Sequence, residues 1–353
     1  MNSWNIDAIL EDRHIDALLV TLPENVRYLS GFTGSSGALL IGSDLRLFLT
    51  DSRYTEQAGR EILDTFEVME IKRFVNDIPS IIVKRGLKSL GFESDHLSYS
   101  TYSSLKAALS EVQFSALKDE LNKLRMQKSA DELEKIKHAI KIATDSLKAV
   151  IGFIKDGVCE RDIAVELEYG MRKRGAERIS FDIIVASGER SSMAHGIATE
   201  KKIKQGEFIT IDFGCYSMGY CSDETVTFVL GNASSEQKRI YNIVKDAHDM
   251  GIENIKAGME AKVLDKIVRD YIKTQGYGNH FGHGTGHGVG LAVHERPTIG
   301  PESDDILCDG MVFTIEPGIY IPHFGGVRIE DMVVVNGDNV DVLTYCEKEF
   351  IAL

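Results

Sequence analysis

Residues 1–120 alternate short apolar runs with stretches of helical periodicity. Short apolar runs bounded by turn residues are typical of buried strands. We expect strands at residues 17–21, 38–41, 45–50 and 89–92. Strands separated by helices predict an α/β unit at the start of the chain.

The alternation breaks over residues 121–130. Ser129, followed three residues later by Glu132, forms a capping box ahead of a long amphipathic helix. The chain has 353 residues, which exceeds the usual length of one domain. We therefore expect two domains, residues 1–124 and 125–353.

The second domain contains an internal repeat with an offset of 101 residues. One glycine-containing turn, one apolar helical stripe and one helix end recur at this offset. The matched pairs are Ile154 and Ile255, Gly157 and Gly258, Ile163 and Leu264, Leu167 and Val268, Met171 and Ile272, and Gly175 and Gly276. Each half then continues into strands, which predicts a pseudo-twofold domain with a central sheet and its helices outside.

Residues 208–228 form a predicted hairpin that carries two acidic residues. Asp212 and Asp223 are equidistant from the midpoint of its turn, between Ser217 and Met218. Simple pairing places them directly opposite, with Cβ atoms about 5 Å apart. Two carboxylates at this separation repel each other, unless a cation lies between them or one of them holds a proton.

The same arrangement recurs in residues 313–331, where Glu316 and Glu330 are equidistant from His323 in a second predicted bend. A single hairpin with facing acids can be an exposed sheet edge. Two such hairpins, each within an apolar alternation, favour a cation-binding site, because buried charges require partners.

Residues 282–290 have glycine at every second position. No Gly-Lys-Ser/Thr follows, so this is not a phosphate loop, and the glycine content excludes a zinc-binding helix. In an extended segment His283, Thr285 and His287 would share one face, and the other face would be bare. His294 follows shortly beyond.

Four carboxylates and one imidazole form an oxygen-rich ligand set, which suits manganese and similar divalent ions better than a thiolate-bound zinc. Two such ions bridged by carboxylates would bind a hydroxide nucleophile and polarise a carbonyl group. The implied chemistry is hydrolysis.

Composition narrows the classes of function. The formal net charge of −14 disfavours nucleic-acid binding. No apolar run approaches the roughly 20 residues of a membrane span, and the N-terminus has no secretory pattern, so we expect a cytoplasmic protein without a membrane partner. Five cysteines without a Cys-x-x-Cys spacing fit reduced thiols.

Five motifs in this order resemble the pita-bread metallopeptidases. They are Ile211-Asp212-Phe-Gly, Tyr220-Cys-Ser-Asp223, Gly282-His-Gly-Thr-Gly-His287-Gly-Val-Gly-Leu, Thr314-Ile-Glu316-Pro-Gly and Val327-Arg-Ile-Glu330-Asp. Residues 25–35 and 49–58 resemble the creatinase-like domain of aminopeptidase P and prolidase. The resemblance implies an α+β protein with a C-terminal pita-bread pseudo-twofold α/β catalytic domain and a smaller creatinase-like α/β N-terminal domain.

The resemblance also implies a ligand set for two divalent metal ions. Asp212 would bind one ion, Asp223 and Glu330 would bridge both, and His287 and Glu316 would complete the second. Glu316 would also accept the proton of the metal-bound water. We expect Mn²⁺, with Co²⁺ or Zn²⁺ as alternatives.

Four further residues acquire roles by the same resemblance. His195 and His294 would line the substrate cleft and steady the tetrahedral intermediate and the leaving proline. His283 would lie beside the proline pocket. Arg328 would brace the site or meet a substrate carboxylate, and the plainer alternative is an ion pair with a neighbouring acid.

The family implies an exopeptidase for peptides with proline in the second position. We favour an Xaa-Pro dipeptidase over an aminopeptidase P that acts on longer peptides, although both share the motifs. Methionine aminopeptidases usually lack the N-terminal domain, creatine amidinohydrolase lacks the metal-ligand set, and non-catalytic peptidase-like binding modules have lost the ligands. Relatives are commonly homodimers, so we expect a homodimer.

One position departs from the family pattern. Val226 stands where relatives commonly carry an arginine. The metal ligands are intact, but any salt bridge that this arginine makes behind the metals is in doubt.

Overall fold

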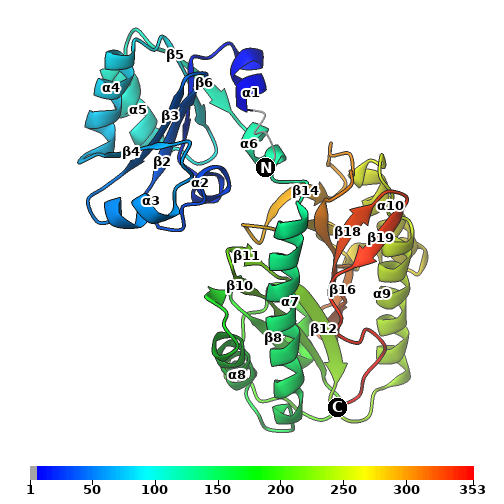
Figure 1. Cartoon of the computed structure of the whole chain (residues 1–353). Helices are drawn as coiled ribbons and strands as arrows, with labels where there is room; N and C mark the ends of the chain where they lie inside the picture. Colours follow the sequence, from blue (N-terminus) through cyan, green and yellow to red (C-terminus); the bar gives the residue numbers. More distant parts are fainter. Residues whose placement is uncertain (1–5) are drawn as a thin grey trace. The chain divides into compact units, whose positions relative to one another are not determined.

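The computed structural model describes residues 6–353. The chain divides into two compact units, Met1–Arg125 and Met126–Leu353. Figure 1 shows both units, each with its own strands and covering helices. Within the described residues, no helix is both long and apolar enough to cross a membrane.

The described part of the first unit is an α/β sheet with the strand order β4-β3-β2-β1-β5-β6. Its strands are β1 Ala17–Val20, β2 Ala38–Gly42, β3 Leu45–Thr50, β4 Glu67–Glu70, β5 Ser89–Glu93 and β6 Gln113–Leu117. Strand β2 is antiparallel to both of its neighbours, and the other pairs are parallel. The helices are α1 Ile6–Arg13, α2 Pro23–Ser30, α3 Thr55–Glu61, α4 Phe74–Arg85, α5 Tyr99–Ala108 and α6 Glu120–Leu124.

Apolar clusters cover both faces of this sheet. Leu18 and Val20 face the cluster that includes α1, α2, α3 and α6, whereas Ala17 and Leu19 face the cluster that includes α4 and α5. The four predicted strands are confirmed. The edge strands β4 and β6 were not predicted, because their mostly exposed or half-buried residues do not form an apolar run.

The second unit contains long helices outside several small sheets (Figure 1). Its helices are α7 Ala130–Val150, α8 Glu160–Lys173, α9 Ser235–Glu253 and α10 Ala261–Thr274, with short 3-10 helices at Ile151–Phe153, Gly188–Ser192 and Gly278–His280. Its strands are β7 Arg178–Ile179, β8 Ile184–Ser187, β9 Phe208–Phe213, β10 Cys215–Ser217, β11 Tyr220–Cys221, β12 Glu224–Val229, β13 Gly286–Gly288, β14 Glu295–Ile299, β15 Val312–Ile315, β16 Gly318–Ile321, β17 Gly325–Arg328, β18 Asp331–Asn336 and β19 Asn339–Val342. The sheet orders are β12-β9-β8 and β14-β13-β15-β18-β19, with a β16-β17 hairpin and a small β11-β10-β7 sheet.

The predicted internal repeat is confirmed. Helices α8 and α10 have 14 residues each and begin 101 positions apart. The repeated glycines Gly157 and Gly258 have φ values of 83° and 84°. Only glycine adopts this left-handed conformation without a steric penalty, which explains why both turns carry it. The six apolar residues of the two helical stripes are fully buried.

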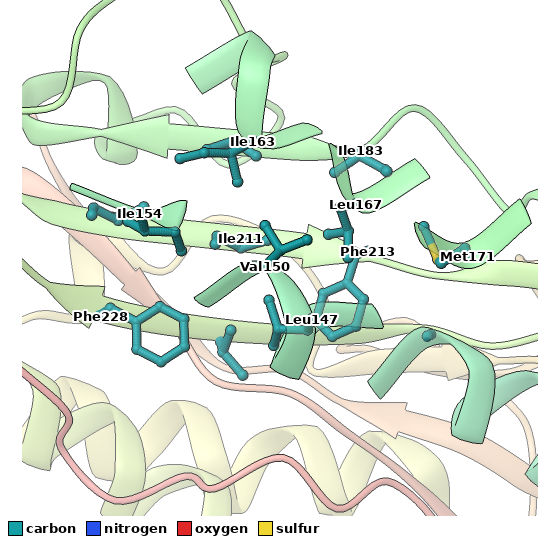
Figure 2. Close-up of a cluster of buried hydrophobic side chains, with 14 of the residues drawn as sticks. Leu147, Val150, Ile154, Ile163, Leu167, Met171, Ile183, Ile211, Phe213 and Phe228 are labelled. Carbon is teal, nitrogen blue, oxygen red and sulfur yellow. The ribbon is translucent and has the colours of Figure 1, made fainter. Parts of the chain in front are cut away.

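The first half of the repeat builds its core between α7, α8 and the sheet that contains β9 and β12. Figure 2 shows the side chains that fill this core. They include Leu147, Val150, Ile154, Ile163, Leu167, Met171, Ile183, Ile211, Phe213 and Phe228. Apolar packing on this scale holds β9 rigidly, and β9 carries Asp212.

Capping boxes begin both long helices. Ser129 and Glu132 form the predicted box at the start of α7, and Ser234 and Gln237 form a second box at the start of α9. Each box satisfies backbone N–H groups that a helix leaves unpaired at its first turn. Both halves of the unit therefore start from equivalent, well-defined helix ends.

Candidate functional site

The first acidic hairpin turns at Met218 and Gly219, where φ is 53° and 88°. Ser217 pairs with Tyr220, and Asp212 pairs with Thr225. The predicted pairing of Asp212 with Asp223 is therefore wrong by two positions. The reason is the turn: a two-residue hairpin loop with positive φ at both positions favours a glycine at its second residue, which moves the midpoint toward Gly219.

A shift of two residues preserves the face of a strand, because side chains alternate with a period of two. Asp212 and Asp223 accordingly line the same cavity. Between them, a side chain at Gly214 would place its Cβ 1.9 Å from the carbonyl oxygen of Ser222. The two sides of the hairpin approach so closely at this point that only glycine fits.

The second acidic hairpin has the predicted register. Gly318 pairs with Arg328 and Ile321 with Gly325, which centres the hairpin on His323. Strands β15 and β18 continue the same register. Glu316 and Glu330 follow β15 and precede β18, so they face each other across the hairpin, as predicted.

The glycine-rich segment forms β13, which lies between β14 and β15. A side chain at Gly286 would place its Cβ 1.8 Å from the carbonyl oxygen of Thr314, so the neighbouring strand excludes any larger residue. His283 and His287 both line the cavity. Thr285 is buried instead against α10, where its amide and hydroxyl donate to Asp265 at 3.1 and 2.8 Å. The predicted common face is therefore wrong for Thr285.

All nine residues singled out in the sequence line one cavity of about 470 Å³. They are His195, Asp212, Asp223, His283, His287, His294, Glu316, Arg328 and Glu330. Phe181, Ile184 and Ile197 add apolar surface to the same cavity. A cavity of this volume and lining suits a small molecule with both charged and apolar parts.

The acidic end of the cavity has the chemistry of a metal site. Ligand atoms of Asp223, His287 and Glu330 all lie within 4.8 Å of one another. His287 Nε2 is 3.6 Å from Asp223 Oδ2 and 3.4 Å from Glu316 Oε1. Asp212 Oδ1 is buried and has no hydrogen-bond partner among residues 6–353. Buried acceptors in this arrangement fit divalent cations.

The carboxylates destabilise one another's charged forms. Burial, followed by repulsion from Glu330, Asp212 and Glu316, raises the pKa of Asp223 well above its usual value. The pKa of Glu330 is raised for the same reasons, and burial raises the pKa of Glu316 to about 7. A bound cation would reverse this effect by compensating the negative charge.

Burial favours the neutral forms of His283, His287 and His294. It lowers the pKa of His287, and it lowers the pKa of His283 and His294 to about 4. His287 Nδ1 lies 3.1 Å from the carbonyl oxygen of Gly288, which can only accept a hydrogen bond. Nδ1 therefore carries the proton, and Nε2 presents its lone pair toward the carboxylates, as a metal ligand requires.

Arg328 forms an ion pair with an acid, which is the simpler role predicted for it from the sequence. Its buried guanidinium donates to Asp212 Oδ2 at 2.5 Å and to the carbonyl oxygen of Ala194 at 3.0 Å. It also bonds the hydroxyl of Thr225 at 3.1 Å. These contacts brace β9, β12 and the loop that carries His195.

Tyr320, which was not predicted from the sequence, contacts two of the residues that line the cavity. Arg328 Nη1 donates to its hydroxyl at 2.9 Å, and the hydroxyl lies 2.9 Å from His283 Nε2. The alternation of the second hairpin, which places Tyr320 four positions from Glu316 and therefore on the same face, was the available signal. A Cβ at Gly318 would lie 2.5 Å from this hydroxyl, so glycine leaves it room.

Val226 is buried in the apolar cluster of the first half, opposite Ile211. At this position the chain uses apolar packing. The neighbouring Glu224 instead forms an ion pair with Lys348.

The fold and the acidic cavity define a metal-dependent hydrolase. Residues 134–337 match the model of metallopeptidase family M24, and residues 5–127 match that of the creatinase/prolidase N-terminal domain. The chain belongs to metallopeptidase family M24, and this membership implies divalent metal ions.

Named relatives match over nearly the full chain. An Xaa-Pro dipeptidase of Pyrococcus furiosus is 39% identical over 344 residues, which cover 97% of each chain. The structure of an Xaa-Pro dipeptidase from Bacillus anthracis matches with a TM-score of 0.96 and 42% identity, covering 99% of this chain and 98% of that one. The crystal structure of an X-Pro aminopeptidase from Thermotoga maritima matches with a TM-score of 0.89 and 39% identity, covering 97% and 99%. The predicted fold class and family are confirmed.

Proposed function

We propose that this protein is an exopeptidase that hydrolyses the bond between an N-terminal residue and proline, with Xaa-Pro dipeptides as its preferred substrates. The observation that carries the proposal is the convergence of four carboxylates and a neutral histidine at one end of a cavity with an apolar wall. Relatives that carry the names Xaa-Pro dipeptidase and X-Pro aminopeptidase support the substrate class.

Two divalent ions would be held by five side chains in this proposal. The residues that would hold them are Asp212, Asp223, His287, Glu316 and Glu330. We propose Mn²⁺, with Co²⁺ or Zn²⁺ as alternatives, because the ligand set is rich in oxygen. Such ions, when bound, lower the pKa of water and polarise the scissile carbonyl group.

The remaining cavity residues act on the substrate. Glu316 accepts a proton from the attacking water and passes it toward the leaving nitrogen. His294 and His195 donate hydrogen bonds to the oxygen that becomes negative during attack. His283, held by Tyr320, lies beside the leaving proline.

Arg328 already pairs with Asp212, so its part in this proposal is to brace the site. The alternative, a contact with a substrate carboxylate, requires the guanidinium to exchange one of its present partners. Measuring the KM for Gly-Pro against that for Gly-Pro-amide in Arg328→Lys tests this choice.

Proline explains why such a cavity is specialised. The bond before proline is a tertiary amide without an N–H group, and the ring fixes the backbone shape. Phe181, Ile184 and Ile197 offer an apolar surface on which the ring can pack. We expect turnover of Xaa-Pro to exceed that of Xaa-Ala by more than about 10²-fold, because the wrong shape misplaces the carbonyl carbon.

Longer Xaa-Pro peptides are the second candidate substrates. The structure named X-Pro aminopeptidase is 39% identical to this chain, close to the 42% of the structure named Xaa-Pro dipeptidase. The comparison of Gly-Pro, Gly-Pro-Pro and Met-Ala-Ser with Mn²⁺ present separates the candidates. Preferred cleavage of Gly-Pro supports the dipeptidase, and preferred cleavage of Gly-Pro-Pro supports the aminopeptidase. Release of methionine from Met-Ala-Ser, with neither proline peptide cleaved, would overturn the proposal.

Three further proposals accompany this function. We propose a domain boundary near residue 124, which the end of the first family match at residue 127 supports. We propose a homodimer, supported by the family resemblance and testable by sedimentation. We propose a cytoplasmic location, testable by cell fractionation.

A further inference from the structure

A buried lysine lies behind the two acidic hairpins. Lys348 Nζ is 2.7 Å from Glu224 Oε1 and 3.3 Å from Asp331 Oδ1. The three side chains are between 2% and 9% exposed. One buried ammonium group therefore joins two buried carboxylates from different hairpins.

The positions of these carboxylates in the chain connect them to the proposed metal ligands. Glu224 directly follows Asp223 and begins β12, and Asp331 directly follows Glu330 and begins β18. Neighbouring side chains along an extended chain point to opposite sides. Asp223 and Glu330 line the cavity, whereas Glu224 and Asp331 point to Lys348 on the other side.

The two hairpins meet at the same place. Glu330 N donates to the carbonyl oxygen of Thr225 at 3.2 Å, and the hydroxyl of Thr225 donates to Glu330 Oε2 at 2.6 Å. The ion pairs of Lys348 lie behind this junction. If Glu224 and Asp331 moved apart, Asp223 and Glu330 would move apart with them, because each pair shares a peptide bond.

The C-terminal segment holds Lys348 in place. The hydroxyl of Tyr241 donates to the carbonyl oxygen of Lys348 at 3.0 Å. Further along, Leu353 N donates to the carbonyl oxygen of Val229 at 2.9 Å, next to β12 (Figure 1). The backbone at Lys348 and at the residues that follow it is thus fixed to other parts of the second unit.

Other groups complete the charge balance around Lys348. Glu224 also accepts from the backbone N–H of Cys346 at 3.0 Å, and His248 Nε2 lies 3.1 Å from Asp331 Oδ2. Burial by itself lowers the pKa of Lys348, but Glu224 and Asp331 raise it above its ordinary value. Without the ammonium group, two buried carboxylates would face each other with too little positive charge between them.

We propose that Lys348 is a positioning residue for the metal centre. By holding Glu224 and Asp331 together, it sets the separation of Asp223 and Glu330 and thereby the affinity for the metal ions. This inference rests on the proposed metal site. Lys348 itself contacts neither the cavity residues nor the substrate position, so its effect is transmitted through the two hairpins.

The test is a titration of metal-free protein with Mn²⁺ by calorimetry. Lys348→Met keeps an unbranched side chain one atom shorter and removes the charge. We expect it to bind Mn²⁺ about 10- to 100-fold more weakly than the wild type, the usual effect of losing a group that orients metal ligands. Lys348→Arg keeps the charge and should recover most of the affinity.

Lys245→Met is the matched control. Lys245 forms ion pairs with Asp249 and with Glu349, which belongs to the same C-terminal segment as Lys348. Its removal perturbs that segment and leaves both ion pairs of Lys348 in place, so Mn²⁺ affinity should stay close to the wild-type value. Equal weakening in Lys245→Met and Lys348→Met would overturn the inference, because it would show a general effect of loosening the segment.

Unchanged Mn²⁺ affinity in folded Lys348→Met would also overturn the inference that Lys348 positions the metal ligands. If this variant does not fold, the same titration uses Lys348→Gln, whose shorter, uncharged side chain removes both ion pairs, and unchanged affinity there has the same meaning. The titration contains no substrate, so it tests the role of Lys348 independently of the proposed peptidase activity. If the protein bound Mn²⁺ but cleaved no Xaa-Pro peptide, the differences in Mn²⁺ affinity between the variants would remain. Absence of Mn²⁺ binding by the wild-type protein would overturn the proposed site and this inference together.

Discussion

Glu316 should make the metal-free protein less stable near neutral pH than near pH 4. Burial raises its pKa from 4.5 to about 7 in the folded, metal-free protein. Below pH 4.5 Glu316 is protonated in both the folded and the unfolded chain, and the stability that its protonated form contributes is fully present. Between pH 4.5 and 7 only the folded protein still holds the proton, so the free energy of unfolding falls as the pH rises. Above pH 7 this contribution no longer changes.

The magnitude follows from the difference in pKa. A difference of about 2.5 corresponds to about 3 kcal/mol, since each pH unit is worth about 1.4 kcal/mol. Glu316→Gln removes the charge and keeps the shape. At pH 8 the metal-free variant should therefore be more stable than the metal-free wild type by about 3 kcal/mol, and at pH 4 the two should be nearly equal. Added Mn²⁺ should reverse the order at pH 8, because the wild type retains the full ligand set.

Urea denaturation of chelator-treated protein at pH 4, 6 and 8 measures this effect. The relevant transition is the one that Mn²⁺ shifts, because a chain of two compact units need not unfold in one step. Glu302→Gln at an exposed position is the control and should change little. Equal stability of metal-free wild type and Glu316→Gln at pH 8 would refute the reasoning, because it would mean that the buried carboxylate carries no electrostatic cost.

Three further predictions concern the site and its support. Glu330→Ala should lose bound metal and turnover together, and elemental analysis that still finds two ions per chain would contradict its proposed role as a metal ligand. His294→Ala should keep its metal while kcat falls by about 10²- to 10³-fold, whereas an unchanged kcat would assign His294 to structure. Leu167→Ala should destabilise the protein by about 2–5 kcal/mol in chemical denaturation, because the side chain is fully buried. The exposed Val165→Ala on the same helix should cost much less.

The candidate site was predictable from the sequence because its parts are local patterns. Alternation and the two symmetric bends placed the acids in pairs, and the second pair has the predicted register. The first register was wrong because backbone conformation at Met218 and Gly219, rather than symmetry of the acids, decides where the hairpin turns. The error of two positions did not change which face of the hairpin Asp223 lies on, because side chains along a strand alternate between its faces with a period of two residues.

Tyr320 and Lys348 illustrate what the sequence left open. Tyr320 lies in a recognisable alternation, but only the folded chain brings its hydroxyl between His283 and Arg328. Lys348 is 124 positions from Glu224, and no spacing rule connects residues so far apart. Such contacts depend on how separate elements pack, which a local pattern does not specify.

The sequence by itself determined the repeated helices, the glycine turns and the acidic hairpins, because 3.6- and 2-residue periodicities and left-handed glycines act over a few neighbouring residues. Only the tertiary structure decided which charges share a buried environment. Packing of the two halves brings Asp212, Asp223, Glu316 and Glu330 into one cavity and places Lys348 behind two of their neighbours. Electrostatic energies depend on separation and burial, and both quantities exist only once the chain has folded.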